Sequence, residues 1–374
     1  MRIGIDARAL GWAGLGRYSR NLLKNLVKQA PPGMEFVVFA PRSLCREFSE
    51  MRGVKLVPVT ASYYSMREQT FFLGSLMREK LDLMHFLHFN APIFYKRPSV
   101  VTIHDLTRFF FPAQKHKGRL HQWAYETVFR SAINNSKKII TVSEHTRMDL
   151  VRYFPKASDK AVIIHEGVDT VMFSKDALDG KSHERLQKLG ITKPYLLFVG
   201  VWMTHKNLPR LLQAFKKVRA RGFSGSLVIT GKGQSHHVDV PDLVNNEGMS
   251  DFVVLPGKVS DEDLPTLFQN AEIFIMPSLY EGFGLPALEA LACGTPVIAS
   301  SVSSLPEILG NAAAYFDPYS VVDMADKISK LISDKQKQVE LVLAGSSQVQ
   351  KFNWDKCAQE TLAVYQSVLK LPSK

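Results

Sequence analysis

Two glutamates eight residues apart enclose a glycine turn in the segment EGFGLPALE, residues 281–289. The apolar run EIFIMPS (272–278) precedes Glu281 and is typical of a buried strand. Pro286 suits the first turn of a helix, because the N–H that proline lacks has no intrahelical partner there. This order of strand, acidic residue, glycine turn and helix start predicts a phosphate site. Two carboxylates beside such a site can accept hydrogen bonds from the hydroxyls of a sugar and a ribose. Glycine turns are common in α/β proteins, so an ordinary core helix is the competing interpretation.

The first half of the chain has two candidate ligand sites of its own. In GWAGLGRYSR (11–20), Gly14 and Gly16 permit a tight loop before a helix that we expect from Arg17, and such a loop can cradle a diphosphate. A plain turn explains the same glycines. In TIHDL (102–106), His104 ends an apolar strand, which places it at the edge where open α/β sheets bind ligands. A histidine bonded to a backbone carbonyl is the alternative there.

The second half carries a lysine between a strand and a helix, in FVGVWMTHKNLPRLLQAF (198–215). Gly200 follows the strand, and Lys206 precedes the helix, where it could neutralise a departing diphosphate or simply be a surface residue. Two further strand ends, ITGKG (229–233) and VLPGKVSDEDL (254–264), lie downstream. Their acids 261–263 imitate a metal-binding motif, but we interpret them as the first turn of a helix capped by Ser260 and predict no metal.

The net charge of +12 lies entirely in the first half of the chain. Residues 1–170 contain 26 Lys and Arg against 14 Asp and Glu, whereas residues 171–374 contain 21 of each kind. This asymmetry indicates either a solubility feature or an acidic partner such as lipid headgroups, a diphosphate-linked acceptor or nucleic acid. Aromatic and basic residues also alternate in 108–130, around Lys115, Lys117, Arg119 and Trp123. That pattern suits a membrane interface, an acceptor groove, single-stranded nucleic acid, or a core stripe with a basic outer face.

The elements that position these residues alternate between short apolar runs and helix-like stretches. Expected strands of the first half are 2–6, 35–40, 54–59, 83–87, 100–104, 138–142 and 161–165. The second half repeats the plan with YLLFVG, SLVITG, FVVLPG, IFIMPS and PVIAS. Nearly continuous hydrophobicity favours parallel sheets covered on both faces, so we predict two doubly wound α/β units with a boundary in 170–192. Residues 353–370 have helical periodicity.

The cysteine pattern and the beginning of the sequence bear on localisation. Three widely spaced cysteines (Cys45, Cys293 and Cys357) form no disulfide or metal pattern, which favours a reducing cytoplasm. MRIGIDARAL does not resemble a signal peptide, and no apolar stretch reaches the roughly 18 residues of a membrane span. We therefore expect a cytoplasmic protein, peripheral on the inner face of the membrane if the basic half contacts lipid.

The segment 281–289 is similar to the signature of the GT4 family of retaining glycosyltransferases, of a mannosyl- and glucosyltransferase-like subgroup. The glycine loop at 11–20, His104-Asp105, SEHTRMDL (143–150), EGVDTVMF (166–173) and Lys206-Asn207 resemble further landmarks of that family in the same order. The resemblance implies the GT-B fold, in which two Rossmann-like doubly wound domains face a central cleft. It implies an acceptor-binding domain at 1–170, a nucleotide-sugar-binding domain at 171–352, and a C-terminal helix at 353–374 that crosses back onto the first domain.

The resemblance also implies an activity: hexose transfer with retention, from GDP-mannose or UDP-glucose to a glycan or lipid-linked acceptor in polysaccharide biosynthesis. His104, Lys206 and Glu281 match the catalytic positions. The implied donor-binding residues are Gly14, Gly16, Gly200, His205, Lys206, Gly231, Gly257, Lys258, Val259, Glu281, Gly282, Phe283, Gly284, Leu285 and Glu289. No cofactor or metal is implied, and an anionic membrane surface is a further expected partner.

This chain departs from the family pattern at one point. Many relatives have an arginine just after the glycine or just before the lysine, where this chain has Val201 and His205. Leaving-group stabilisation is therefore expected to depend on Lys206 and backbone N–H groups, with His205 as a partial substitute. Two alternatives remain open at this stage: a GT-B sugar-nucleotide epimerase, and a basic nucleic-acid-binding protein without enzymatic activity.

Overall fold

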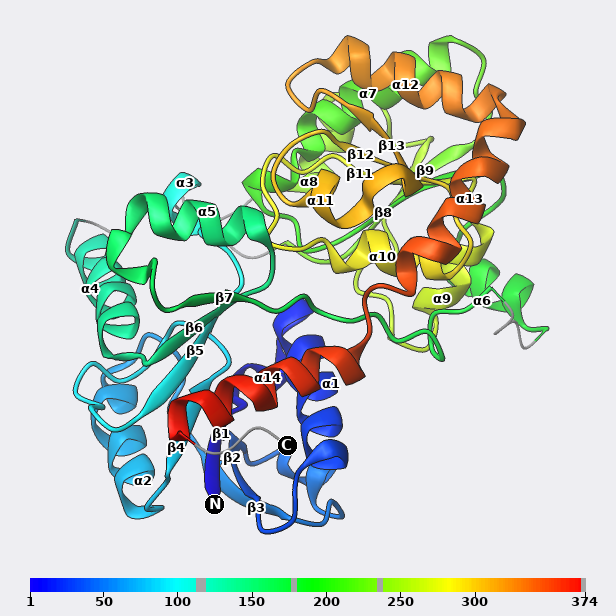
Figure 1. The fold of residues 1–374 in the computed structure, drawn as a ribbon. Helices are drawn as coiled ribbons and strands as arrows, with labels where there is room; N and C mark the ends of the chain where they lie inside the picture. Colours follow the sequence, from blue (N-terminus) through cyan, green and yellow to red (C-terminus); the bar gives the residue numbers. More distant parts are fainter. Residues whose placement is uncertain (112–118, 176–179, 234–237, 371–374) are drawn as a thin grey trace. The chain divides into compact units, whose positions relative to one another are not determined.

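The computed structural model describes residues 1–111, 119–175, 180–233 and 238–370, with no account of the side chains of 119–121. The chain divides into two compact units, each with its own parallel sheet (Figure 1). Unit 1 comprises the chain up to Leu106, then the stretch from α4 to Gly167, and α14. Unit 2 comprises Val168–Asn353 together with the short helix α3 (Thr107–Phe110). Lys115 and Lys117 lie outside the described residues.

Unit 1 is built on a seven-stranded sheet in the order β3-β2-β1-β4-β5-β6-β7. The strands are β1 (Arg2–Asp6), β2 (Glu35–Pro41), β3 (Val54–Val59), β4 (Leu83–Phe86), β5 (Ser99–Ile103), β6 (Lys138–Thr141) and β7 (Ala161–Ile163). Its helices are α1 (Gly14–Gln29), α2 (Leu73–Arg78), α4 (Arg119–Asn135), α5 (Glu144–Tyr153) and α14 (Trp354–Leu369). Short helical turns are η1 (Arg8–Gly11), η2 (Cys45–Phe48), the π-turn η3 (Glu68–Phe72) and η4 (Pro155–Ala157). All seven expected strands are confirmed, within one or two residues at their ends.

Unit 2 has a six-stranded sheet in the order β10-β9-β8-β11-β12-β13. The strands are β8 (Tyr195–Val199), β9 (Ser226–Thr230), β10 (Val253–Val254), β11 (Ile273–Met276), β12 (Val297–Ser300) and β13 (Ala313–Phe316). Its remaining helices are α6 (Ser182–Lys188), α7 (Leu208–Ala220), α8 (Val240–Asn246), α9 (Leu264–Asn270), α10 (Leu285–Ala292), α11 (Leu305–Leu309), α12 (Val321–Ser333) and α13 (Lys335–Val349). The turns η5 (Thr204–Lys206) and η6 (Gly310–Ala312) complete the unit.

Both sheets follow the doubly wound plan, and every strand pairing in them is parallel. The order of strands reverses between β1 and β4 in unit 1, and between β8 and β11 in unit 2. In such sheets the loops that leave the carboxyl ends of the two strands at the reversal diverge and leave room for a ligand. The loops after β1, β4, β8 and β11 are therefore where binding sites are expected.

The C-terminal helix α14 belongs to unit 1, as the sequence predicts, and lies alongside α1 (Figure 1). Its buried face includes Trp354, Cys357, Leu362 and Tyr365, which recur at helical spacing. At its first turn, Lys28 of α1 forms an ion pair with Asp355 at 3.1 Å.

A buried polar chain connects α14 to the strands of unit 1. The Tyr365 hydroxyl lies 2.6 Å from Nδ1 of His85, and Nε2 of His85 lies 2.8 Å from the hydroxyl of Thr102. The Tyr18 hydroxyl is 3.1 Å from the same Thr102 oxygen. Burial, with a smaller contribution from the nearby charge of His104, lowers the pKa of His85 to about 3. His85 is therefore neutral in the folded protein, which suits a ring whose partners are hydroxyls.

Three local expectations were wrong. The glycines at 14 and 16 do not form a loop before the helix, because α1 already begins at Gly14. The acids 261–263 precede α9 and are not its first turn, although the Ser260 hydroxyl does accept a hydrogen bond from the Asp263 N–H at 3.1 Å. Strand β13 was missed, because AAYF (313–316) contains no β-branched residue.

Candidate active site

The loop after β8 in unit 2 carries Lys206 to the edge of the sheet. It ends in the 3₁₀ turn η5, and Asn207 then adopts the left-handed conformation (φ 59°) immediately before α7. The buried Asn207 side chain donates to the carbonyls of Pro277 and Pro318, at 3.1 and 2.8 Å. Asn207 thus fixes the end of the lysine loop to the end of β11, an anchoring role that the sequence did not predict.

Lys206 and Glu281, both predicted as catalytic, lie together at the reversal point of this sheet. Nζ of Lys206 is 2.6 Å from Oε1 of Glu281, and the two side chains are only 15% and 11% exposed. The residues are 75 positions apart, so the pairing results from the neighbouring positions of β8 and β11. A partly buried cation and a carboxylate are therefore present at the point where the motif predicts a phosphate and a sugar.

The Gly-Phe-Gly turn after Glu281 is held by two serines that were not predicted. The Ser303 hydroxyl accepts from the Glu281 N–H at 2.9 Å and donates to the Glu281 carbonyl at 2.6 Å. The Ser304 hydroxyl donates to the carbonyls of Glu281 and Phe283, at 3.0 and 3.3 Å. With its carbonyls bonded to these hydroxyls, the turn keeps a fixed shape.

Gly284 ends this turn and is required on two grounds. Its φ of +101° is a conformation that residues with a side chain rarely adopt, and a Cβ there would lie 2.8 Å from Cδ2 of Leu305. Helix α10 begins at the next residue, with Pro286 in its first turn as predicted. The N–H groups at the start of this helix have no intrahelical partner, so they can bind an anion. Glu289 lies further along α10 and is 1% exposed.

Three predicted glycines from separate loops meet at the same edge. The Gly231 N–H donates to the Gly257 carbonyl at 2.8 Å, and the Gly200 N–H donates to the Thr230 carbonyl at 3.3 Å. A Cβ on Gly231 would lie 1.9 Å from the Gly200 carbonyl oxygen, so glycine is obligatory at this contact. The loops after β8, β9 and β10 therefore form one backbone surface, to which Lys258 adds an exposed and Val259 a buried side chain.

His205, the expected substitute for the missing arginine, is 6% exposed. Its carbonyl accepts from the Leu279 N–H at 2.7 Å, and its ring lies 6.0 Å from that of Phe111. The neighbouring Phe110, in α3, packs on Tyr280 with ring centroids 4.9 Å apart. The two aromatic residues thus contact the residues that immediately precede Lys206 and Glu281. Whether His205 compensates for the arginine stays a prediction.

In unit 1, His104 follows β5 and has a partner at each ring nitrogen. Nδ1 lies 2.9 Å from Oε1 of Glu166, and Nε2 lies 3.0 Å from the Leu87 carbonyl. The ring packs on that of Tyr18 in edge-to-face geometry, with centroids 4.5 Å apart. A carbonyl can only accept, so Nε2 donates to the Leu87 oxygen and the Glu166 carboxylate faces Nδ1. Glu166 was not predicted, because it is 62 residues from His104.

The glycine segment of unit 1 has a packing role that the structure makes explicit. A Cβ on Gly16 would lie 2.4 Å from the Leu10 carbonyl oxygen, whereas a Cβ on Gly14 would meet no atom within 4 Å. Gly16 therefore lets α1 approach the turn after β1. Its contact with a diphosphate stays a prediction.

The acidic run at 261–263 contacts neighbouring polar side chains through Asp263. Asp263 bonds to the Ser260 hydroxyl at 2.7 Å and lies 3.5 Å from the Arg185 guanidinium. Among the residues that the structure describes, no group of three or more His, Cys, Asp or Glu could hold a metal ion. The helices described here also include none that is long and apolar enough to cross a membrane.

Comparisons with known proteins cover nearly the whole chain. The family model described as Glycosyltransferase Family 4 matches residues 12–171, and the model described as Glycosyl transferases group 1 matches residues 182–348. O-antigen chain mannosyltransferase B of Escherichia coli is 29% identical over 375 residues, which cover 94% of this chain and 95% of that protein. Sucrose-phosphate synthase from Thermosynechococcus elongatus has a similar fold, with a TM-score of 0.79, 20% identity and 99% of both chains covered. Anabaena HepE in complex with UDP and glucose has a TM-score of 0.77 at 17% identity, covering 98% of this chain and 100% of that chain.

Two doubly wound units, with a lysine and a glutamate paired beside a helix-starting glycine turn, define a glycosyltransferase with the GT-B fold. Its homologues are mannosyl- and other glycosyltransferases of glycan biosynthesis, and nothing in the comparisons supports an epimerase or a nucleic-acid-binding protein. The chain belongs to glycosyltransferase family 4.

Proposed function

We propose that the protein transfers a hexose from a nucleotide-sugar to a glycan or lipid-linked acceptor, with retention at the anomeric carbon and without a metal ion. The observation that carries this proposal is the Lys206–Glu281 pair beside the start of α10. It combines a cation for the diphosphate, a carboxylate for sugar hydroxyls and a helix N-terminus for phosphate oxygens.

In the proposed reaction, the bond between the anomeric carbon and the diphosphate oxygen breaks, and its electron pair stays on the phosphate. Lys206 and the N–H groups at Phe283–Leu285 stabilise the charge that builds on that oxygen, and one well-placed donor contributes about 3 kcal/mol. The acceptor hydroxyl attacks from the same face of the sugar, and its proton passes to the departing phosphate. Glu281 holds sugar hydroxyls, Glu289 the ribose and His104 the far side of the sugar.

For the donor, the proposal names a class of compound, the nucleoside-diphosphate hexoses. The E. coli relative is a mannosyltransferase, and the Anabaena structure contains UDP and glucose. GDP-mannose and UDP-glucose are therefore the first donors to test. The backbone surface formed by Gly200, Gly231 and Gly257, with Lys258 and Val259, is the proposed site of the nucleotide.

A basic surface cluster in unit 1 supports contact with an anionic lipid surface. The cluster consists of Lys137, Lys156 and Lys160, and burial and then the charges of Lys137 and Lys156 lower the pKa of Lys160. Tyr153, nearby in sequence, is 45% exposed. Cationic and aromatic side chains in one place suit the headgroup region of a membrane. Binding to phosphatidylglycerol vesicles that is lost with Lys137→Glu and Lys156→Glu would support this partner, and equal binding of the variant would exclude the cluster.

A nucleotide panel and a transfer assay test the proposed activity. UDP or GDP should raise the melting temperature of the protein, because a ligand that binds only the folded state stabilises it. NMR of the product should show the anomeric configuration of the donor, and turnover should be unchanged in EDTA. Absence of stabilisation by any nucleotide, inversion, or loss of turnover in EDTA would contradict the corresponding part of the proposal.

A further inference from the structure

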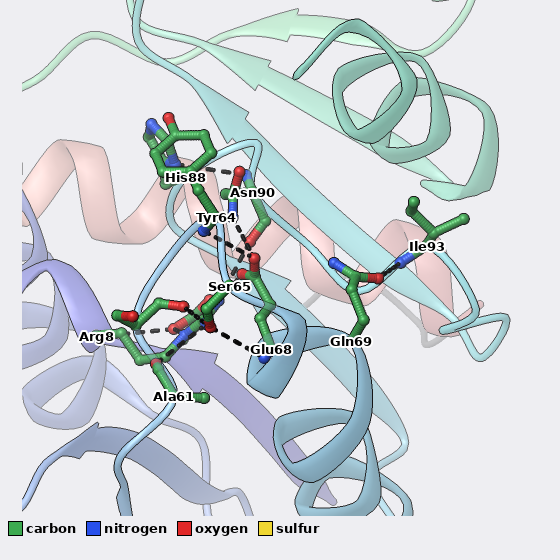
Figure 2. Close-up of polar contacts among 11 residues, drawn as sticks. Arg8, Ala61, Tyr64, Ser65, Glu68, Gln69, His88, Asn90 and Ile93 are labelled. Atoms are coloured by element: carbon green, nitrogen blue, oxygen red, sulfur yellow. Dashed lines mark hydrogen bonds and ion pairs between the residues drawn. The ribbon is translucent and has the colours of Figure 1, made fainter. Parts of the chain in front are cut away.

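A buried ionic cluster lies at the reversal point of the unit 1 sheet, at the ends of β1 and β4. The Arg8 guanidinium donates to both carboxylate oxygens of Asp6, at 2.8 and 2.7 Å, and to Oε1 of Glu68 at 2.7 Å. The three side chains are between 0% and 2% exposed. Arg8 also donates to the Asn90 carbonyl at 3.2 Å, and the Asn90 amide donates to Glu68 (Figure 2).

This one guanidinium fixes three chain segments, because its bonds reach residues of each. Arg8 itself begins η1, Glu68 begins η3 after the 61–67 loop, and Asn90 lies in the loop after β4. Each segment also supplies one aromatic residue to a common surface cluster, formed by Trp12, Tyr63 and His88. Because the bonds of Arg8 fix all three segments, the three aromatic rings keep their positions without a ligand.

Trp12 is the exposed member of this aromatic cluster. Trp12 is 43% exposed, whereas Tyr63 and His88 are each 8% exposed. The ring centroids of Tyr63 and His88 lie 5.2 and 5.8 Å from that of Trp12, both in edge-to-face geometry. A single exposed tryptophan is ordinary. An exposed indole held on two buried rings at the ligand-binding edge of a sheet is a preorganised stacking surface.

Two buried polar atoms of the same region lack partners. Within the described part of the chain, the Tyr63 hydroxyl and Oδ1 of Asn90 have no hydrogen-bond partner. An unsatisfied buried polar atom costs roughly 1–3 kcal/mol, so a ligand group that reaches one of these atoms and bonds to it would recover that free energy. Burial raises the pKa of Tyr63 well above its usual value, so the hydroxyl keeps its proton and can donate.

The charges of the region select the class of ligand. Arg8 faces two carboxylates, so the cluster offers no surplus positive charge to a phosphate or a sulfate. A hydrocarbon chain would leave the Tyr63 and Asn90 oxygens unsatisfied. A pyranose ring fits both conditions, because its C–H face can pack on an indole while its hydroxyls pair with buried polar atoms.

We propose that the Trp12–Tyr63–His88 cluster is the subsite for a neutral pyranose ring of the acceptor. This inference rests on the proposed transferase function and extends it, since it makes the acceptor group recognised by unit 1 a carbohydrate instead of a lipid or a phosphate. Trp12 provides the stacking surface, and the Tyr63 hydroxyl provides a hydrogen bond.

The test is a titration of the whole chain with methyl α-D-mannopyranoside and methyl α-D-glucopyranoside, followed by saturation-transfer NMR and tryptophan fluorescence. The expected result is binding of at least one pyranoside, weakened about tenfold or more by Trp12→Ala and less by Trp12→Phe. Inorganic pyrophosphate should not compete at this subsite. Phe94→Ala is the matched control, because Phe94 is an aromatic residue that is 70% exposed and is not a member of the cluster.

Tyr63→Phe separates ligand contact from a structural effect. Removing a buried hydroxyl without a partner should leave the melting temperature unchanged or slightly raised, and should weaken pyranoside binding about threefold. Wild-type pyranoside affinity in both Trp12→Ala and Tyr63→Phe, or no pyranoside binding at all, overturns the inference. UDP and GDP stabilisation, measured on the same samples, distinguishes this failure from a failure of the proposed function, which would abolish the nucleotide response as well.

Discussion

Replacing Lys206 by alanine should damage both stability and turnover, by amounts that the structure allows us to separate. The ammonium lies 2.6 Å from the Glu281 carboxylate, and both side chains are largely buried. Exposed pairs contribute about 0.2–1 kcal/mol, and removing one partner of a fully buried pair costs about 3–5 kcal/mol. We expect an intermediate loss of about 2 kcal/mol in the free energy of unfolding, or roughly 4–8 °C in melting temperature for a unit of this size.

The loss of turnover should be larger than the loss of stability. Lys206 is proposed to stabilise charge that develops only as the diphosphate departs, and removal of one such donor typically lowers kcat by about 10²–10³. Thermal unfolding and steady-state kinetics with GDP-mannose and UDP-glucose measure the two effects on the same preparation. Lys216→Ala is the control, since Lys216 is exposed and lies 3.8 Å from Glu247, so its loss should change stability by no more than about 0.5 kcal/mol.

A double-mutant cycle shows whether the pair is coupled. Glu281→Ala should also reduce turnover severely, but the double variant should be less destabilised than the sum of the single variants, by about 1–2 kcal/mol. Near-normal turnover in Lys206→Ala would refute the assigned role of the lysine. Strictly additive destabilisation would show that the ion pair does not stabilise the folded protein.

Two further predictions concern Gly284 and His85. Gly284→Ala should lower the free energy of unfolding by about 1–3 kcal/mol and with it the melting temperature. The reason is that a Cβ would lie 2.8 Å from Leu305 and that alanine is strained at a φ of +101°. An unchanged melting temperature in calorimetry would contradict this account. The pKa of His85 is lowered by burial to about 3, below the value of about 6.5 expected in the unfolded chain, so its contribution to stability is complete above pH 6.5 and is lost as the pH falls toward 3. Through this group alone, the free energy of unfolding should be about 2 kcal/mol lower at pH 5 than at pH 7. Urea unfolding of His85→Gln should show a correspondingly smaller loss of stability between the two pH values. An identical pH dependence in the variant would show that other groups cause the loss.

Elements and motifs that are local in sequence could be predicted. Continuous apolar runs identify parallel strands, and the order of Glu281, Gly284 and Pro286 correctly placed a turn and the start of α10. Strand β13 was missed because its two alanines are depleted in strands, and the start of α1 at Gly14 was missed because glycine is a poor helix former. Family resemblance then identified residues whose spacing alone left alternatives open.

The long-range contacts of the candidate site could not be predicted from local patterns. The serines that hold the Glu281 turn lie 22 and 23 residues away, and hydroxyl side chains are frequent in any loop. Glu166 lies 62 residues from His104, in a segment to which the motif analysis assigned no chemistry. Such partners are determined by which strands become neighbours in the sheet. The residues of one loop therefore suggest a ligand, whereas the supporting residues emerge only from the folded structure.

The position of α14 constrains the order in which the protein can fold during synthesis. Unit 1 contains both the first strand and the last helix, so translation completes all of unit 2 before Tyr365 is made. Until then Nδ1 of His85 lacks the Tyr365 hydroxyl, and the surface of α1 on which α14 packs is exposed to solvent. Unit 2 is contiguous apart from α3, so it can close its core while the nascent chain is still attached to the ribosome. The unit translated first is therefore the unit that matures last, and part of its apolar surface stays uncovered until α14 is made.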